Sequence, residues 1–133
     1  MSAVENGTHM VSDAAHRITE FLRREVDEAL RTVLILEADG WTGVYLRDDL
    51  RDLYDRDGYE DVVDQFREFS IGPKPESIGH IGKRRVLVHY HDEAFVFQFP
   101  FEAGESILVC IDEDVGQGLS TFVERCREQL YAD

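Results

Sequence analysis

Two histidines, two residues apart, are the side chains of this sequence whose spacing best suits metal chemistry. His89 and His91 lie in an apolar segment. Residues two apart in a β-strand project from the same face, so both imidazoles would point to one side of a sheet. There they could bind a transition metal, with Asp92, Glu93 or His80 as a further ligand. None of these three has convincing spacing, so two histidines on the less apolar face of a sheet are the simpler interpretation.

Other constellations that catalysis requires are absent from the sequence. Gly79-His80-Ile81-Gly82 lacks the strand-to-helix step and the Lys-Ser/Thr pair of a phosphate-binding loop. Ser106, Ser120 and Thr121 have no patterned His and Asp partners. Cys110 lies in an apolar segment with no flanking cation to lower its pKa. We therefore expect no catalytic residue, no resident metal or cofactor, and no enzymatic activity.

The stretch GVYLRDDL, residues 43–50, combines an aromatic ring, an arginine and two carboxylates. Its pattern is better explained as a strand that passes into a helix. Asp48 or Asp49 lies where a helix favours an N-terminal cap and a negative first turn. Arg47 and Tyr45 then leave the end of the strand side by side. We interpret these two residues as candidates for a partner contact.

The charge balance excludes several classes of partner. The 133 residues include 28 acidic and 14 basic side chains, a formal net charge of −14, and the only lysines are Lys74 and Lys83. Such a surface repels nucleic acid, which binds proteins largely through cations on phosphates, and it disfavours anionic lipid. A cytoplasm near molar salt, where the Debye length is about 3 Å, explains the acidity best. A basic partner and chance are the alternatives.

Length and hydropathy predict one domain in solution. A chain of 133 residues with 43% hydrophobic residues favours a single core. No run approaches the roughly 18 apolar residues of a membrane span, and no signal peptide begins the chain. We expect a cytoplasmic protein. Two cysteines make no disulfide framework, and two buried, reduced thiols are the simpler interpretation of Cys110 and Cys126.

The first half of the chain predicts a helix followed by a hairpin. Residues 1–11 show no period and are expected to be mobile; Gly7 to Met10 could equally be a cloning remnant. From a cap at Ser12 or Asp13, apolar residues recur at helical spacing to about residue 30. A strand over 32–36, covered on both faces, then turns at Asp39-Gly40 into a strand over 41–46.

The middle of the chain predicts one or two short helices and a loop. Apolar residues return at helical spacing from Asp48 to Phe69, with an interruption at Gly58. Residues 72–77, GPKPES, contain two prolines and a glycine and are expected to form a loop that Gly79 and Gly82 extend.

Residues 84–112 predict a three-stranded meander. A two-residue turn at Asp92-Glu93 and a second turn at Glu102-Ala103-Gly104 give one consistent register. Both turns place the same aromatic and aliphatic residues on one face. The expected pairs are Val86–Phe99, Val88–Phe97, Tyr90–Phe95, Phe99–Ile107, Phe97–Val109 and Phe95–Ile111.

The opposite face of the meander is mixed. Leu87, Val96 and Leu108 form an apolar strip there, with His89 and His91 at its margin. If no helix covers the strip, it is a contact surface for a partner. If the first helix or the last helix covers it, it is core. The last helix is expected over residues 115–131, with its apolar stripe at Leu119, Phe122, Val123, Cys126 and Leu130.

Together these elements predict an α+β fold in one domain over residues 12–131. The order is helix, two strands, one or two helices, three strands, helix, and the five-stranded sheet is mainly antiparallel. This order resembles the roadblock and profilin-like sandwiches, a resemblance that implies homodimers and partner binding. The stretch YLRDDL, residues 45–50, resembles a group of short acidic haloarchaeal proteins with no established activity.

The sequence therefore favours a non-enzymatic protein-interaction or regulatory domain that forms homodimers and binds a protein partner whose identity it does not specify. The candidate contact residues are Tyr45, Arg47, Leu87, His89, His91, Val96 and Leu108. One alternative is a small-molecule sensor, which needs a cavity between the phenylalanine-rich face and a helix. The other is a metal-assisted enzyme that uses His89 and His91.

Overall fold

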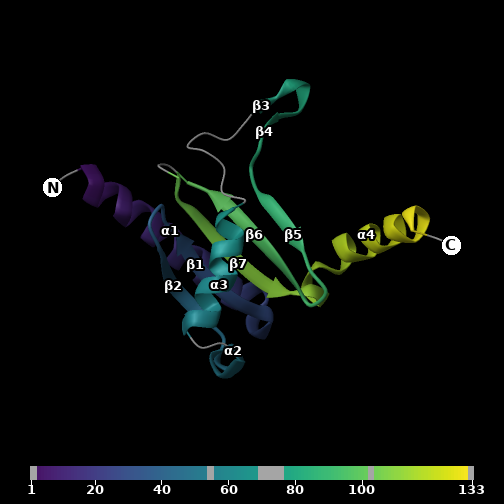
Figure 1. Ribbon diagram of the computed structural model, residues 1–133, viewed down its shortest axis with the longest axis horizontal. Coiled ribbons are helices and arrows are strands. Elements are labelled where there is room, and N and C mark those ends of the chain that lie inside the picture. The colour runs from purple at the N-terminus through teal and green to yellow at the C-terminus, as the bar shows by residue number, and fades with distance from the viewer. Residues whose placement is uncertain (1–2, 54–55, 69–76, 102–103, 132–133) are drawn as a thin grey trace.

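The computed structural model describes residues 3–53, 56–68, 77–101 and 104–131 (Figure 1). Five strands form one antiparallel sheet in the order β2-β1-β7-β6-β5, which confirms the predicted α+β class. The strands are β1 (Leu30–Leu36), β2 (Trp41–Leu46), β5 (Leu87–Tyr90), β6 (Ala94–Pro100) and β7 (Ser106–Asp112). The α-helices are α1 (Ala3–Glu25), α2 (Asp48–Leu53), α3 (Arg56–Arg67) and α4 (Gln117–Leu130).

The meander forms in the predicted register. Phe95, Phe97 and Phe99 pair with Ile111, Val109 and Ile107 across β6 and β7. Val88 pairs with Phe97 and Tyr90 with Phe95, and the amide of His91 donates to the carbonyl of Ala94 over 2.9 Å. Gly104 has the positive φ, 77°, that its turn requires. The expected pair of Val86 with Phe99 does not form, because β5 begins at Leu87.

The first hairpin joins the meander through its first strand. β1 pairs with β2 on one side and with β7 on the other, so it is an interior strand of the sheet. The turn at Asp39-Gly40 forms as predicted, with the amide of Glu37 donating to the carbonyl of Gly40 over 2.8 Å. The side chain of Arg67, in α3, donates to the same carbonyl over 3.1 Å. This contact holds the end of α3 against the hairpin.

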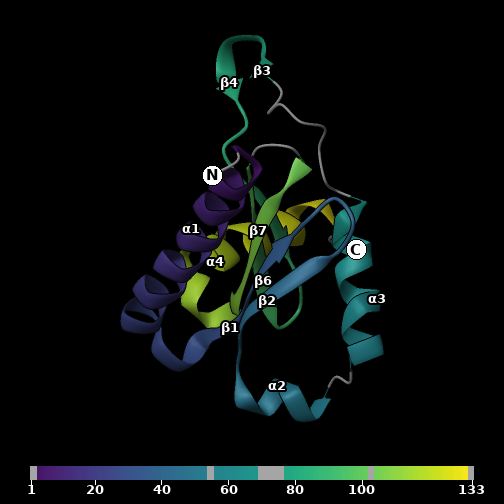
Figure 2. The same cartoon turned by 90° about the vertical axis from the view of Figure 1, so that its left-hand side faces the viewer.

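Helices cover both faces of the sheet, with α1 on one side and α3 on the other (Figure 2). The core under α1 contains Val11, Ala15, Leu30, Val33, Ile35, Phe95, Ile107, Val109 and Ile111. The core under α3 contains Leu34, Leu36, Val63, Val96 and Leu108. Strand β1 supplies residues to both cores, as the prediction of a strand covered on both faces requires.

The boundaries of the first helix differ from the prediction. Helix α1 begins at Ala3 rather than at a cap on Ser12 or Asp13, and Val11 is buried under it. Val11 extends the apolar period of Ala15 backward by one turn, which explains why the helix continues. The mobility predicted for residues 1–11 stays a prediction.

The same helix ends at Glu25, not near residue 30. Asp27 adopts a positive φ of 50° and opens a short 3₁₀ turn, η1 (Asp27–Ala29). Asp tolerates this left-handed conformation better than most residues. Strand β1 therefore starts at Leu30, two residues earlier than expected.

Two features of the middle segment also differ. Gly58 lies inside α3 instead of interrupting it. Where a loop was expected around Gly79 and Gly82, a small hairpin forms from β3 (Ser77–Ile78) and β4 (Gly82–Lys83) around the 3₁₀ turn η2 (Gly79–Ile81). Both glycines have positive φ, and this permits the tight turn. The rest of the predicted loop, residues 72–76, lies outside the described residues.

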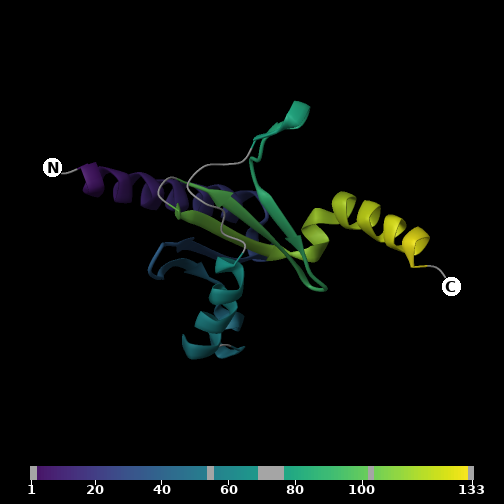
Figure 3. The same cartoon turned by 45° about the horizontal axis from the view of Figure 1, so that its top comes forward.

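Helix α4 projects from the end of the sheet instead of packing on it (Figures 1 and 3). It follows β7 through a 3₁₀ turn, η4 (Glu113–Gly116). Its apolar side chains are largely in solvent: Leu119 is 43% exposed, Phe122 65% and Leu130 71%. Cys126 is exposed as well, so the prediction of two buried thiols is wrong for this cysteine. Helical periodicity identified the apolar stripe, but it could not say that the stripe lacks a covering surface.

Gly116 sets the point at which α4 leaves the body. A Cβ atom added there would lie 2.6 Å from Cε2 of Phe95, a side chain that is fully buried. A Cβ at Gly118, two residues further, would meet nothing within 4 Å. The close approach at Gly116 therefore requires glycine, whereas Gly118 does not.

Substitution Gly116→Ala should lower the free energy of unfolding by about 1–3 kcal/mol, because the new methyl group must displace Phe95 in a packed core. Gly118→Ala is the matched control and should be neutral or stabilise the chain by up to about 1 kcal/mol, since alanine favours helix. Denaturant titrations of both variants in molar KCl measure the difference. Equal stability of the two variants would contradict the close approach at Gly116.

Candidate functional site

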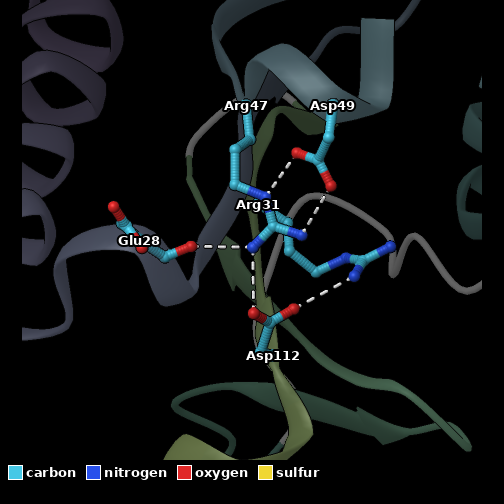
Figure 4. Close-up of polar contacts among 5 residues, drawn as sticks. All are labelled: Glu28, Arg31, Arg47, Asp49 and Asp112. Carbon is cyan, nitrogen blue, oxygen red and sulfur yellow. Dashed lines mark hydrogen bonds and ion pairs between the residues drawn. The ribbon is translucent and has the colours of Figure 1, made fainter. Parts of the chain in front are cut away.

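The guanidinium of Arg47 joins segments that are far apart in the sequence (Figure 4). Its Nε and Nη2 donate to the two carboxylate oxygens of Asp49 over 2.6 and 3.0 Å. Its Nη1 donates to the backbone carbonyl of Glu28 over 2.7 Å and to Asp112 over 2.9 Å. One side chain thus ties η1, the start of α2 and the end of β7 to the end of β2.

Asp112 also accepts a hydrogen bond from a second arginine. Its other carboxylate oxygen accepts a hydrogen bond from Nη1 of Arg31 over 3.0 Å. The side chains of Arg31, Arg47 and Asp112 are 18%, 21% and 29% exposed, so this group is only partly screened by water. We call Arg31, Arg47, Asp49 and Asp112 the arginine junction. Their charges, two positive and two negative, cancel.

The hydrogen bonds between Arg47 and Asp49 shift the pKa values of both residues. The hydrogen bond from Arg47 lowers the pKa of Asp49 below its ordinary value of 3.8, although some desolvation opposes the shift. The pKa of Arg47 is raised, chiefly by the hydrogen bond to Asp49, with burial opposing it and Asp112 adding to the rise. Both shifts favour the charged forms. Arg47 and Asp49 are therefore a stable ion pair, not groups poised to exchange a proton near neutral pH.

An open groove of about 900 Å³ lies beside the arginine junction. Its lining includes Arg23, whose guanidinium lies 5.4 Å from the centre of the Tyr45 ring. The arginines are accompanied there by carboxylates of Glu28, Asp48, Asp49, Asp112 and Asp114. This mixture of charges gives the groove no clear preference for an anion or a cation. Arg47 and Tyr45 therefore stay candidates for a protein contact, and Arg47 would have to leave its internal bonds to make one.

The remaining predicted contact residues lie beneath or beside α3. Val96 and Leu108 are buried in the core with Val63 of α3, so they offer no surface to a partner. The strip was expected to be covered by the first helix or the last helix, or by none. Helix α3 covers it instead, because the apolar face that contains Val63 and Phe66 packs on it. Leu87 is half-buried at the start of β5.

The two histidines lie at the edge of this covered strip. The ring of Phe66 meets the ring of His89 edge-on at 5.1 Å and that of His91 at 6.2 Å. His89 Nε2 lies 3.3 Å from Oε1 of Gln98, a buried side chain that also contacts Ser106. In the part of the chain that the structure describes, no three His, Cys, Asp or Glu side chains are grouped to hold a metal ion.

Cys110 lies in a small cavity between α3 and the sheet. The cavity measures about 110 Å³ and is lined mainly by apolar residues, with Arg31 at its margin. Burial raises the pKa of the Cys110 thiol, and the nearby Arg31 offsets only part of this effect. The expectation that no cation flanks Cys110 is therefore wrong, since Arg31 reaches it from the neighbouring strand. The raised pKa nevertheless makes the thiol a weak nucleophile at neutral pH.

Two further candidate surfaces are apolar, one on α4 and one on the aromatic face of the meander. We call Leu119, Phe122, Val123, Cys126 and Leu130 the α4 stripe. We call Tyr90, Phe95, Phe97 and Phe99 the aromatic row; their ring centres are 4.6, 6.1 and 6.5 Å apart in succession. Phe95 is buried, but the other three are only half-buried, and the neighbouring Val88 is 43% exposed. The sequence predicted the aromatic row as a core face of the meander and the α4 stripe as the apolar face of the last helix.

Comparison with known proteins places the chain in a family. A family described as a domain of unknown function (DUF7522) matches residues 16–131. The chain belongs to this family. The match includes the arginine junction, the aromatic row and the α4 stripe. No curated protein and no solved structure matches the chain. Within the described part of this DUF7522 chain, no helix combines the length and apolarity that crossing a membrane requires.

Substitution Arg47→Lys should lower the free energy of unfolding by about 1–3 kcal/mol. Lysine cannot form the forked contact to Asp49 and still reach Asp112 and the Glu28 carbonyl. Arg51→Lys is the matched control, because the side chain of Arg51 is 65% exposed and its Nη1 lies as far as 4.0 Å from Oδ1 of Asp48. The effect of this substitution on the free energy of unfolding should stay within about 0.5 kcal/mol. Thermal or denaturant unfolding measures both. An Arg47→Lys variant as stable as wild type would exclude the junction as a stabilising element.

The lowered pKa of Asp49 predicts a pH-dependent contribution to stability. A carboxyl whose pKa is lower in the folded state stabilises the fold above its unfolded value, here 3.8, and this contribution is lost as the pH falls through the folded value. Wild type should therefore be more stable than Asp49→Asn at about pH 6, and the gap should close below about pH 3.8. Asp48→Asn, which removes an exposed carboxylate, should show no such closing gap.

Proposed function

We propose that this chain is a non-enzymatic protein-interaction domain that associates with itself. The observation that carries the proposal is the α4 stripe, a row of large apolar side chains that α4 presents to solvent. Exposed apolar surface of this kind, bordered by polar residues, is typical of protein contact sites. The resemblance to roadblock and profilin-like sandwiches, which implies homodimers, agrees with it as a fold-level analogy.

The chemistry of the described side chains supports a role other than catalysis. The arginine junction is made of charged groups that already neutralise one another. The thiol of Cys110 has a raised pKa and lies in a narrow cavity. His89 and His91 are packed against Phe66 and have no third ligand beside them among the described residues. None of these groups combines a nucleophile with a base and an acceptor for developing charge.

We further propose that the domain works in a cytoplasm near molar salt. Two chains that each carry a charge of −14 repel one another at low ionic strength. At molar salt the Debye length is about 3 Å, so this repulsion acts only at contact. The resemblance of residues 45–50 to acidic haloarchaeal proteins supports the same setting.

A small-molecule sensor is the second candidate, and the cavity beside Cys110 is the observation that favours it. The sensor hypothesis expected a cavity between the aromatic row and a helix, whereas this cavity lies on the opposite face, under α3. Its volume of about 110 Å³ is below the roughly 300–1,000 Å³ of ordinary ligand pockets. The interaction domain is therefore the better supported function.

Light scattering in KCl tests the self-association. We expect a mass near twice 15.3 kDa in molar KCl and a fall toward the monomer mass at low salt, where repulsion is unscreened. Circular dichroism at each salt concentration is the control, because an unfolded chain would also lose its dimer. A folded chain that stays at the monomer mass in molar KCl at high protein concentration would overturn the proposal.

A further inference from the structure

We propose that two copies of this chain exchange their C-terminal helices: the α4 stripe of each copy packs on the aromatic row of the other, beside α1. This inference rests on the self-association proposed above and assigns it a surface. The two surfaces involved, one on a helix and one on a sheet, are both apolar and both incompletely covered within one chain. Each therefore supplies what the other lacks.

The α4 stripe is a single helical face. Its members are spaced by three, one, three and four residues, which keeps them on one side of a helix with 3.6 residues per turn. Thr121, Glu124 and Glu128 lie on the opposite side. Among the residues of α4 only Ser120 is buried and Val123 is half-buried, so most of this helix lies in solvent. The stripe needs another surface to remove it from water.

The aromatic row is a surface of matching chemistry. Tyr90, Phe97 and Phe99 keep part of their rings exposed, and Val88 beside them is 43% exposed. Helix α1 covers the neighbouring part of the same face, where Val11 and Ala15 meet the core. An α-helix that lies beside α1 on this face would complete the layer. Helix α4 has 14 residues and is about 21 Å long, which is comparable to a seven-residue strand such as β6.

The exposed area of the chain agrees with a missing contact. Its accessible surface is 9558 Å², whereas a folded monomer of 15.3 kDa is expected to expose about 7,100 Å². Among the described elements, α4, the N-terminal end of α1 and the hairpin of β3 and β4 project from the body (Figure 1). A stable interface buries about 800 Å² on each partner. The excess is large enough to include such an interface.

Charge favours a second copy over other occupants. Helix α4 carries two arginines and two glutamates, so it is neutral in a chain of charge −14, and the members of the aromatic row are uncharged. Two copies could therefore meet at these surfaces with their acidic surfaces apart. A basic partner would find no excess of carboxylates on α4. A membrane-surface helix usually carries an excess of cations on its polar face, which α4 lacks.

The connection between β7 and α4 explains why the helix reaches another copy instead of its own sheet. Gly116 packs directly against Phe95, and this contact sets the direction in which α4 departs. To fold back on its own aromatic row, the chain would have to rearrange η4 and break that contact. Exchange between copies leaves it intact, and exchange of a terminal element is a common route to dimers.

Two matched variants test the role of the stripe. Phe122→Glu adds one carboxylate on the α4 stripe, and Thr121→Glu adds one on the opposite side of α4; both positions are exposed. We expect Phe122→Glu to raise the dimer dissociation constant at least tenfold in molar KCl, and Thr121→Glu to change it less than twofold. Because both side chains are exposed, circular dichroism should show both variants folded. Equal dissociation constants for the two variants would overturn the proposal.

Nuclear magnetic resonance of mixed copies locates the receiving surface. An unlabelled Thr121→Cys/Cys110→Ala/Cys126→Ala variant carries a spin label at residue 121, and the other copy is ¹⁵N-labelled wild type. In the exchanged dimer, amide signals of residues 97–99 of the wild-type copy should lose intensity. The reverse experiment dilutes a ¹⁵N-labelled, spin-labelled copy into excess unlabelled wild type, and its own signals of residues 97–99 should be retained.

The outcomes separate the two proposals. Intensity loss confined to residues 117–130 would indicate pairing of α4 with α4, and loss within the diluted labelled copy would indicate closure of α4 on its own sheet. Either result overturns the exchange and leaves self-association standing. A monomer by light scattering would overturn self-association itself. If that monomer bound phosphatidylcholine vesicles and Phe122→Glu did not, the occupant of the stripe would be a lipid surface, which also overturns the exchange.

Discussion

The arrangement of this domain depends on the ion pairs of Asp112, the last residue of β7. Its carboxylate accepts hydrogen bonds from Arg31 and Arg47, which belong to the first hairpin. The backbone pairing of β1 with β7 joins the hairpin to the meander along the strands, and the arginine junction fastens the two at one end. From the same end the chain continues through η4 into α4. The position of the projecting helix is thus tied to the position of this ion-paired group.

Local patterns predicted the meander because its register depends on neighbouring residues. The turns at Asp92-Glu93 and at Gly104 pair strands whose apolar side chains then point to the same face of the sheet. A slip of one residue in the pairing would place Phe95 on the opposite face. The junction could not be predicted in this way. The sequence drew attention to Arg47, but its partner Asp112 is 65 residues away, and nothing local marks one carboxylate among 28.

Periodicity also could not decide which helix covers which face. Helices α3 and α4 both have an apolar side, and both carry a phenylalanine on it, Phe66 and Phe122. One covers the sheet face that contains Val96, and the other lies in solvent. The difference comes from the connections: α3 is held by Arg67 on the first hairpin, whereas α4 leaves the body at Gly116. Such contacts arise only in the assembled fold, so the sequence predicted two amphipathic helices and not their different surroundings.

The acidity of the chain and its exposed apolar helix fit together physically. Salt weakens attraction between exposed charges, so the exposed ion pair of Arg51 and Asp48 can contribute little to stability or binding in molar KCl. The removal of apolar surface from water is not screened by salt in this way. In the proposed high-salt setting, specific association would therefore rely on apolar contact. The α4 stripe, neutral and apolar in a chain of charge −14, keeps its strength under those conditions.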